Sequence, residues 1–350
     1  MIKILFVIGQ LTGGGGEKAL VNLVNRLDPG KFTVTVLTVV PGGEARLKPH
    51  IRCRCLNPQN SPLRRLWLRF CAQLGWVYPL YIREDADLEV AYLESFPTKL
   101  LAAASDAVKI AWVHCDLANK TGHRKMRRWY RRYHRIVCVS RDVETSFRRY
   151  FDGDTVVLPN VLNVDEILGK SGETQAPEFD ILAVGRLSRE KGIDRLLTAC
   201  EGLGASIGIM GDGPLRQELE AQARAMHLNA TFLGHQENPY PYMAAAKLQV
   251  LPSRSEGLST VAQEGLLLGK AVVAAPCAGM AQLLSGCALI TEDFRAGMET
   301  LLNREDLRRD LENKARIRGR ELAKRDPVRE TEAFLLETLE KYGGQKWKST

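Results

Sequence analysis

The chain lacks the long apolar segments and the paired cysteines that mark several classes of protein. No uninterrupted hydrophobic stretch approaches the roughly 18 residues that a membrane-spanning helix needs, and the opening run of residues 1–8 is too short for a secretory signal. The eight cysteines include no Cys-x-x-Cys pair, and no histidine stands at the spacing of a zinc ligand. We therefore expect a cytoplasmic protein with reduced thiols and no bound metal.

The common nucleotide-binding fingerprints are also missing. In the glycine-rich segment 9–16, no glycine stands two residues after Gly9, as the dinucleotide pattern requires, and no Lys-Ser or Lys-Thr pair follows, as in a Walker loop. No Asp-x-Asp pair follows a predicted strand. Dehydrogenase and kinase-like classes are therefore disfavoured. The segment can still bring helix amides close to an anion, and the alternative is a tight connection between a strand and a helix.

What the sequence does contain is a composition close to the globular average. Its 350 residues are 45% hydrophobic and 26% charged, which excludes collagen-like, coiled-coil and wholly disordered classes and predicts about two domains. The net charge of +8 is uneven, because residues 1–165 hold 25 Lys and Arg against 15 Asp and Glu, whereas residues 166–350 hold 24 against 26. We expect the first half to meet an anionic partner, such as nucleic acid, an acidic membrane or a phosphorylated substrate.

Short apolar runs alternate with helical segments along the chain. They cover residues 4–8, 32–40, 88–92, 108–113, 136–139 and 156–158, and then 181–184, 206–210, 230–233, 248–251 and 271–275. Apolar strands separated by helices are typical of parallel sheets covered on both faces. We predict an α/β fold with two Rossmann-like domains.

The predicted domain boundaries follow from changes in composition. The domains are residues 1–165 and 166–325, with a flexible interdomain linker over 169–179, where large apolar side chains are scarce. Residues 326–342 are predicted to form a helix that packs back on the first domain, and residues 343–350 a flexible tail.

The second half places charged residues directly after two predicted strands. Arg186 and Lys191 follow the run 181–184, where a guanidinium and an ammonium can bind a diphosphate. Glu256 follows the predicted strand 248–251, and Glu264 lies on the helix beyond it. Carboxylates at these positions can accept hydrogen bonds from sugar hydroxyls. Ligands bind outside the carboxyl ends of parallel strands, so these residues are candidates for one site. Solvated loop charges and a surface acid pair are the alternatives.

Several segments together resemble the motifs of the family 4 glycosyltransferases, which use nucleotide sugars, retain anomeric configuration and have the GT-B fold of two facing Rossmann-like domains. The segments are Gly185-Arg186-Leu187 to Lys191-Gly192, Gly211-Asp212-Gly213-Pro214, Pro252-Ser253 through Glu256 to Glu264, and Gly269-Lys270-Ala271-Val272-Val273. The resemblance spans nearly the whole chain, because Trp112-Val113-His114-Cys115-Asp116 and Pro159-Asn160 extend it into the first half.

The resemblance implies a set of site residues. Arg186 and Lys191 would bind the donor phosphates, Glu264 the ribose, and Glu256 and His114 would act beside the transferred sugar. The loop residues assigned to the donor and its phosphates are Gly14, Gly15, Gly257, Leu258 and Ser259. No obligatory cofactor or metal ion is implied, and the co-substrate would be a nucleoside diphosphate sugar, linked to UDP or to GDP.

Two basic segments of the first half predict a contact with an acidic surface. Residues 124–135 hold seven Lys or Arg and no acid, and their aromatic residues share one helical face. The arginines predicted to meet acceptor or lipid phosphates are Arg127, Arg128, Arg131 and Arg132. In a second amphipathic segment, Trp67 and Phe70 are predicted to enter the membrane interface. A surface helix and a short packing helix are the respective alternatives.

These features predict a glycosyltransferase of bacterial polysaccharide biosynthesis that moves a hexose-type sugar, with retention, to a lipid-linked saccharide acceptor. We expect it at the inner face of the membrane, with the donor, the acceptor and the anionic membrane surface as partners and no nucleic acid. A basic nucleic-acid- or membrane-binding module without transferase activity is one alternative, although it leaves the charged residues of the second half unexplained. A nucleotide-sugar epimerase of the same fold is the other.

Overall fold

The chain forms two compact units, each built around one parallel sheet. The computed structural model describes residues 1–350 except 103–104, 106, 278 and 345–350. The first unit comprises Met1–Leu162 together with the chain from Asp326 onward, and the second comprises Asn163–Arg325. Of the tail predicted over 343–350, residues 345–350 lie outside the described residues.

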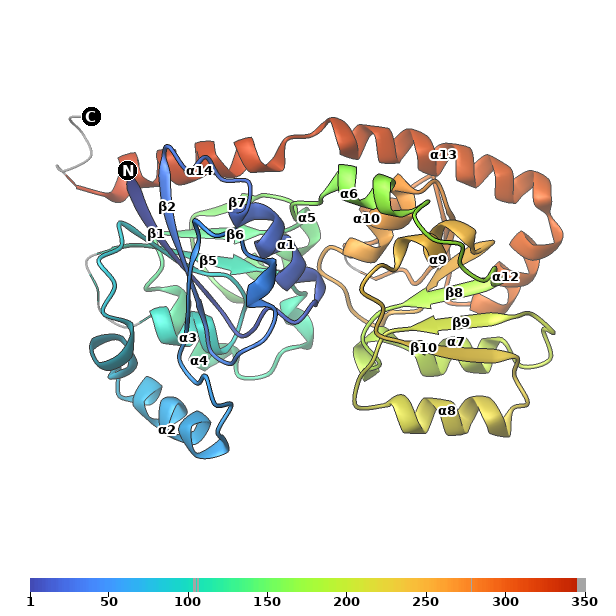
Figure 1. The fold of residues 1–350 in the computed structure, drawn as a ribbon, viewed down its shortest axis with the longest axis horizontal. Coiled ribbons are helices and arrows are strands. Elements are labelled where there is room, and N and C mark those ends of the chain that lie inside the picture. Colours follow the sequence, from blue (N-terminus) through green and yellow to red (C-terminus); the bar gives the residue numbers. More distant parts are fainter. Residues whose placement is uncertain (103–104, 106, 278, 345–350) are drawn as a thin grey trace. The chain divides into compact units, whose positions relative to one another are not determined.

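The sheet of the first unit has the strand order β3-β2-β1-β4-β5-β6-β7, and every pair is parallel (Figure 1). Its strands are β1 (Ile2–Ile8), β2 (Phe32–Thr38), β3 (Arg52–Cys55), β4 (Leu88–Ala91), β5 (Val108–Val113), β6 (Arg135–Cys138) and β7 (Thr155–Val157). The strand order reverses between β1 and β4, and in open sheets of this kind ligands bind outside the carboxyl ends of the strands at that point.

Helices and helical turns connect these strands. They are α1 (Gly15–Val24), η1 (Glu44–Arg46), α2 (Pro62–Gln73), η2 (Tyr78–Ile82), α3 (Phe96–Leu101), η3 (Leu117–Asn119), α4 (His123–Tyr130), α5 (Arg141–Tyr150) and α14 (Pro327–Tyr342). Two of the helices begin at capping residues: Ser61 and Asp326 accept hydrogen bonds from the first-turn amides of α2 and α14. Each of these two helices also has a proline at its first position.

The sheet of the second unit has the order β10-β9-β8-β11-β12-β13, again with parallel pairs throughout. Its strands are β8 (Ile181–Val184), β9 (Ile207–Met210), β10 (Ala230–Gly234), β11 (Leu248–Leu251), β12 (Ala271–Ala274) and β13 (Leu289–Ile290). Its helices and turns are α6 (Val164–Lys170), η4 (Arg189–Lys191), α7 (Ile193–Ala199), α8 (Arg216–Ala225), α9 (Tyr240–Ala245), α10 (Thr260–Leu267), α11 (Ala281–Leu284), α12 (Phe294–Asn303) and α13 (Glu305–Lys324). Here the strand order reverses between β8 and β11.

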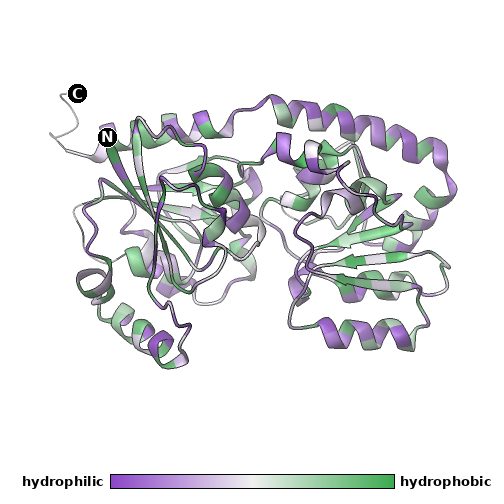
Figure 2. Cartoon of the chain, viewed as in Figure 1, coloured by the Kyte–Doolittle hydropathy of each residue, from purple (hydrophilic) through white to green (hydrophobic). Residues whose placement is uncertain are grey.

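Burial explains why the strands could be recognised in the sequence. The central strands β5, β6, β11 and β12 are buried at every position, and Figure 2 shows the sheets as mostly hydrophobic whereas α13 is mostly hydrophilic. The prediction of two Rossmann-like parallel sheets is confirmed. The edge strands β3 and β13 were missed, because β3 reads Arg-Cys-Arg-Cys and β13 has two residues, so neither forms an apolar run.

The segment 169–179 does not join the two units. The second unit begins at Asn163, and the end of α6 lies within it, where Asn238 Nδ2 donates a hydrogen bond to the Lys170 carbonyl at 3.0 Å. The scarcity of apolar side chains in this segment marks a surface coil, and such a coil can lie inside a domain as well as between domains.

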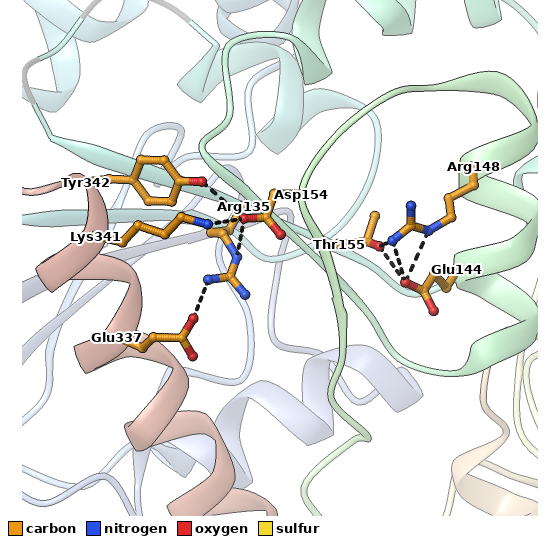
Figure 3. A network of polar contacts seen from close by, with 8 residues as sticks. All are labelled: Arg135, Glu144, Arg148, Asp154, Thr155, Glu337, Lys341 and Tyr342. Atoms are coloured by element: carbon orange, nitrogen blue, oxygen red, sulfur yellow. Dashed lines mark hydrogen bonds and ion pairs between the residues drawn. The ribbon is translucent and has the colours of Figure 1, made fainter.

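Helix α14 is held to the first unit by a polar network (Figure 3). Arg135, whose side chain is 7% exposed, pairs with Glu337 at 2.9 Å and with Asp154 at 3.3 Å. Asp154 also accepts hydrogen bonds from Lys341 at 2.9 Å and from Tyr342 at 3.1 Å. Burial alone would raise the pKa of Asp154, but these hydrogen bonds and the Arg135 charge hold it below its usual value. The network ties β6 and the start of β7 to the last helix.

Asp154→Asn should lower the free energy of unfolding at pH 7 by about 1–3 kcal/mol, because the buried guanidinium of Arg135 loses an anion. The folded-state pKa of Asp154 is depressed, so its contribution is complete above about pH 4 and is lost as the pH falls below that value. Urea unfolding at pH 7 and pH 3 should therefore show a larger difference between wild type and Asp154→Asn at pH 7 than at pH 3. Asp152→Asn, at an exposed position two residues away, is the matched control. An equal loss at both pH values would contradict this role.

Candidate active site

The point of strand reversal in the second unit brings two of the predicted residues together. Lys191 ends the turn η4 after β8, and Glu256 lies in the loop after the neighbouring strand β11. The Lys191 Nζ lies 2.6 Å from Glu256 Oε1, and Ser253 Oγ donates a hydrogen bond to the same oxygen at 2.7 Å. The Glu256 side chain is 11% exposed. A cation and a carboxylate predicted to act on one donor are therefore already in contact.

Arg186 stands on the same loop but points to solvent. Its side chain is exposed and makes no hydrogen bond or ion pair with the residues that the structure describes. The loop backbone is held by the Gly-Asp-Gly motif after β9, because Leu187 N donates to Asp212 O at 2.9 Å and a Cβ at Gly211, with φ +129°, would lie 2.0 Å from the Gly185 carbonyl oxygen. Arg186 is thus a cation on an anchored backbone with its guanidinium available to an anion.

Glu264 lies in α10 and is 3% exposed. The hydroxyl of Tyr240, which lies at the start of α9, donates to Glu264 Oε1 at 3.4 Å. Sequence reasoning missed Tyr240, because its partner lies 24 residues away and no local pattern links the two. The helix itself begins after Ser259, whose hydroxyl accepts a hydrogen bond from Ala262 N at 3.3 Å. Gly257 and Leu258 precede this N-terminus, where amide groups favour anions.

In the first unit, His114 follows β5 and packs between the first turn of α1 and an aromatic ring. Its ring centroid lies 4.8 Å from that of Tyr92, and a Cβ at Gly16 would lie 3.4 Å from its Nδ1. Both ring nitrogens are buried and have no hydrogen-bond partner among the described residues. Burial lowers the pKa of His114 to about 3, so the imidazole is neutral at physiological pH. It can therefore donate or accept a hydrogen bond but carries no charge.

This burial predicts a pH-dependent stability. The unfolded chain takes up a proton at His114 below about pH 6.5, and the folded chain does not, so His114 should cost the protein about 2 kcal/mol on going from pH 7.5 to pH 5. His114→Gln should remove that part of the loss. Urea unfolding at the two pH values measures it, with His50→Gln, at an exposed histidine, as the control. The same pH dependence in wild type and His114→Gln would refute the assignment.

Glu94, which no sequence motif indicated, holds the backbone beneath His114. Its carboxylate accepts hydrogen bonds from the amides of His114 and of Cys115, the latter at 2.8 Å. Burial raises the pKa of Glu94, and the amide hydrogen bonds oppose that rise. The residue after it, Ser95, has φ +81°, a backbone angle that non-glycine residues rarely adopt. The one sequence feature that could have indicated Glu94 is its position, since it is an acidic residue three residues after the end of β4.

The glycine-rich loop of the first unit already holds an anion of its own. The Glu17 carboxylate accepts hydrogen bonds from the amides of Gly13 at 2.7 Å and Gly14 at 3.1 Å, and from the Thr12 hydroxyl at 3.3 Å. Gly15 begins α1. A phosphate at the Gly14 amide would thus compete with Glu17, which sequence reasoning did not single out.

The basic segment is shorter as a helix than predicted. Helix α4 ends at Tyr130, so Arg131 and Arg132 lie in the turn beyond it, and the helix expected over 124–135 is wrong in its last turn because Arg135 enters β6. Arg127, Arg128, Arg131 and Arg132 are all exposed. Arg127 donates to the Tyr150 carbonyl at 2.9 Å, and none of the four makes an ion pair within the described part of the chain.

Helix α2 turns its apolar side outward. Trp67 is 47% and Phe70 48% exposed, and the helix packs on the unit through Leu68 and Cys71. Further exposed apolar residues on and after the helix are Leu63, Leu66, Leu74, Trp76 and Leu80. The aromatic rings contact one another, with Phe70 and Trp76 centroids 6.4 Å apart. We call these residues, with Trp67 and Phe70, the α2 apolar face.

Among the residues that the structure describes, no cluster of three or more His, Cys, Asp or Glu side chains could hold a metal ion. Over the same residues, no helix has the length and hydrophobicity needed to cross a bilayer.

Comparison with known proteins agrees with this architecture. The chain is 27% identical to a Campylobacter jejuni enzyme named GalNAc-alpha-(1->4)-GalNAc-alpha-(1->3)-diNAcBac-PP-undecaprenol alpha-1,4-N-acetyl-D-galactosaminyltransferase, over 91% of this chain and 94% of that one. It is 23% identical to an uncharacterized glycosyltransferase of Haemophilus influenzae, over 91% and 95% of the two chains.

Solved structures share the fold. Anabaena HepE, solved with UDP and glucose, matches with a TM-score of 0.76 and 20% identity over 97% of this chain and all of that one. The sucrose-phosphate synthase of Thermosynechococcus elongatus matches with a TM-score of 0.80 and 18% identity over 97% and 99%. Residues 13–166 match the family described as Glycosyltransferase Family 4, and residues 178–304 match Glycosyl transferases group 1. The chain belongs to the family 4 glycosyltransferases, and its two Rossmann-like units are those of the GT-B fold.

Proposed function

We propose that this glycosyltransferase moves a hexose-type sugar from UDP to a lipid-linked saccharide and retains the anomeric configuration. The observation that carries the proposal is the contact of Lys191 with Glu256 beside the exposed Arg186, at the strand reversal of the second unit. The structural neighbour from Anabaena was solved in complex with UDP and glucose, which favours a UDP donor over a GDP donor.

Each charged group has a role that its surroundings allow. Arg186 and Lys191 bind the diphosphate, aided by the amides at the N-terminus of α10 after Gly257, Leu258 and Ser259. Glu264, oriented by Tyr240, accepts hydrogen bonds from the ribose hydroxyls. Glu256 presents its second oxygen to the donor sugar, because Lys191 and Ser253 both hold Oε1.

The group that most needs stabilisation in the reaction is the leaving diphosphate. The bond between the anomeric carbon and the phosphate oxygen breaks, its electron pair stays on the diphosphate, and the acceptor oxygen bonds to the same face of the sugar. The acceptor proton passes to the departing phosphate. Lys191 and Arg186 stabilise the negative charge that develops there, and neutral His114 is a hydrogen-bonding group toward the sugar. Gly14 and Gly15 are proposed to bind the donor through their backbone, with the donor competing against Glu17 for the Gly14 amide.

The acceptor side belongs to the first unit. The Campylobacter jejuni relative is named for an acceptor linked to PP-undecaprenol, so we propose a lipid-linked diphosphate saccharide here. Arg127, Arg128, Arg131 and Arg132 supply positive charge that no acid of the described chain neutralises as an ion pair. Phosphate groups are the complementary partner.

We further propose that the α2 apolar face, including Trp67 and Phe70, enters an acidic membrane surface. The face is exposed, and aromatic side chains are favoured at the boundary between headgroups and acyl chains. Arg64, Arg65 and Arg69 of the same helix carry positive charge that attracts anionic lipids. This attachment would keep the enzyme at the inner face of the membrane.

Radiolabelled UDP-hexoses and GDP-hexoses, each incubated with and without an undecaprenyl-diphosphate-linked saccharide, test the function. Label should pass from one UDP-sugar to the lipid fraction, and NMR of the product should show the donor's anomeric configuration. Transfer from GDP-sugar alone would overturn the donor, and an inverted product would overturn retention. An altered free UDP-sugar, with no label in lipid, would identify an epimerase.

A further inference from the structure

A second charged pair joins the two loops that carry Lys191 and Glu256. The Arg254 guanidinium contacts Asp194 through two parallel hydrogen bonds, Nη1 to Oδ1 at 2.7 Å and Nη2 to Oδ2 at 2.6 Å. Asp194 lies in the first turn of α7, three residues after Lys191, and Arg254 lies two residues before Glu256. The hydrogen bond from Arg254 holds the pKa of Asp194 below its usual value, so this carboxylate is ionised near neutral pH.

The backbones of the two loops are also in direct contact. Arg254 N donates to the Glu190 carbonyl at 2.7 Å, and its Nη1 donates to the Arg189 carbonyl at 3.0 Å. Gly192 has φ +67°, and a Cβ there would lie 2.1 Å from the Pro252 carbonyl oxygen. Only glycine allows this approach. The two loops therefore meet in one arrangement. The two hydrogen bonds between Arg254 and Asp194, which we call the fork, connect them.

Together these contacts form a closed ring that includes Lys191 and Glu256, the residues proposed to act on the donor. Lys191 and Glu256 meet on one side of the ring, Arg254 and Asp194 meet on the other, and short stretches of backbone connect the two pairs. No hydrogen bond joins the fork to the side chains of Lys191 or Glu256, all four of which the structure describes. Apart from the change in charge, which has opposite signs in Arg254→Gln and Asp194→Asn, a change in the fork reaches those side chains by moving the loops.

We propose that Arg254 and Asp194 are positioning residues that set the spacing between Lys191 and Glu256, so that Lys191 can pass from Glu256 to the donor's β-phosphate without a shift of either loop. The proposal rests on the proposed function, in which Lys191 binds the diphosphate. A planar guanidinium in a two-bond fork fixes direction as well as distance, which a lysine at the same position does not.

The exposure of the fork separates this role from a purely structural one. The side chains of Arg254 and Asp194 are 35% and 39% exposed, and ion pairs in that setting add little to folding stability. A small displacement of a group that must contact a phosphate weakens that contact strongly. Loss of the fork should therefore alter phosphate binding far more than it alters the melting temperature.

Calorimetric titration of the full chain with UDP and with UMP tests the inference. The ratio of the UMP to the UDP dissociation constant isolates the contribution of the β-phosphate, and Lys191→Gln should reduce this ratio about tenfold. Arg254→Gln and Asp194→Asn should each reduce the same ratio about fivefold while the UMP affinity changes less than about twofold, and Arg254→Lys should fall between Arg254→Gln and wild type. Arg254→Gln added to Lys191→Gln should have no further effect.

Lys247→Gln is the matched control, because Lys247 pairs with Asp180 at 2.7 Å across the opposite ends of the same strands, β8 and β11. It should leave the ratio of the UMP to the UDP dissociation constant unchanged. An unchanged ratio in Arg254→Gln and Asp194→Asn, or an equal loss for UMP and UDP with a lower melting temperature, would overturn the positioning role. A wild-type protein without affinity for UDP would instead overturn the proposed function, and GDP with GMP would then serve for the same comparison.

Discussion

Glu256→Gln should reduce turnover by about a hundred- to a thousandfold while it leaves the affinity for UDP within about threefold of wild type. The substitution removes the carboxylate charge beside the proposed sugar position but keeps the shape of the side chain. It also frees Lys191 from its ion pair at 2.6 Å, so nucleotide binding has no reason to weaken. Steady-state transfer assays measure turnover, and calorimetry with UDP measures affinity.

Glu264→Gln provides the contrasting case. This buried side chain is proposed to bind the ribose, so its loss should weaken UDP and UDP-sugar to the same extent, by about ten- to a hundredfold, and lower turnover less at saturating donor. Glu218→Gln, at an exposed position of α8, controls for the change in charge. If the variants at 256 and 264 lost binding and turnover in the same proportion, the division of roles between the two carboxylates would be wrong.

Replacement of Arg127, Arg128, Arg131 and Arg132 by Gln should weaken binding to vesicles that contain acidic lipid by about a thousandfold, since each cation near a charged leaflet contributes about 1 kcal/mol. Transfer to a lipid-linked acceptor should fall with it, while affinity for UDP is retained. Wild-type binding should also weaken with added salt, because the screening length falls from about 10 Å at 0.1 M to about 3 Å at 1 M. Vesicle sedimentation measures the binding.

Two controls accompany this experiment. Arg127 donates a hydrogen bond to the Tyr150 carbonyl, so a triple variant that keeps Arg127 separates loss of charge from loss of this contact. Four cations of α13, all of them paired with acids, give a variant with the same change in net charge; they are Arg309, Lys314, Arg316 and Arg318. Normal transfer to lipid-linked acceptor by the quadruple arginine variant would show that the arginines are merely a solvated surface.

The sequence by itself determined the two parallel sheets and the order of their central strands along the chain. A strand covered by helices on both faces must be apolar at nearly every position, and such runs are visible without any knowledge of long-range contacts. That Arg186, Lys191 and Glu256 follow strands at one edge of the sheet could be predicted for a related reason, since residues after strands of a parallel sheet share one edge. The edge strand β3 escaped prediction because the edge of a sheet does not require apolar residues, and β13 escaped it because it has only two residues.

Only the tertiary structure decided which partners these residues have. Arg254 and Asp194 lie 60 residues apart, and Glu94 lies 20 residues from the His114 amide that it binds, so no local pattern predicts either contact. The same holds for α2, whose amphipathic sequence fits a packing helix and a membrane-facing helix equally well. Whether an apolar stripe is buried depends on how the neighbouring elements cover it, and the folded unit covers Leu68 and leaves Trp67 and Phe70 exposed.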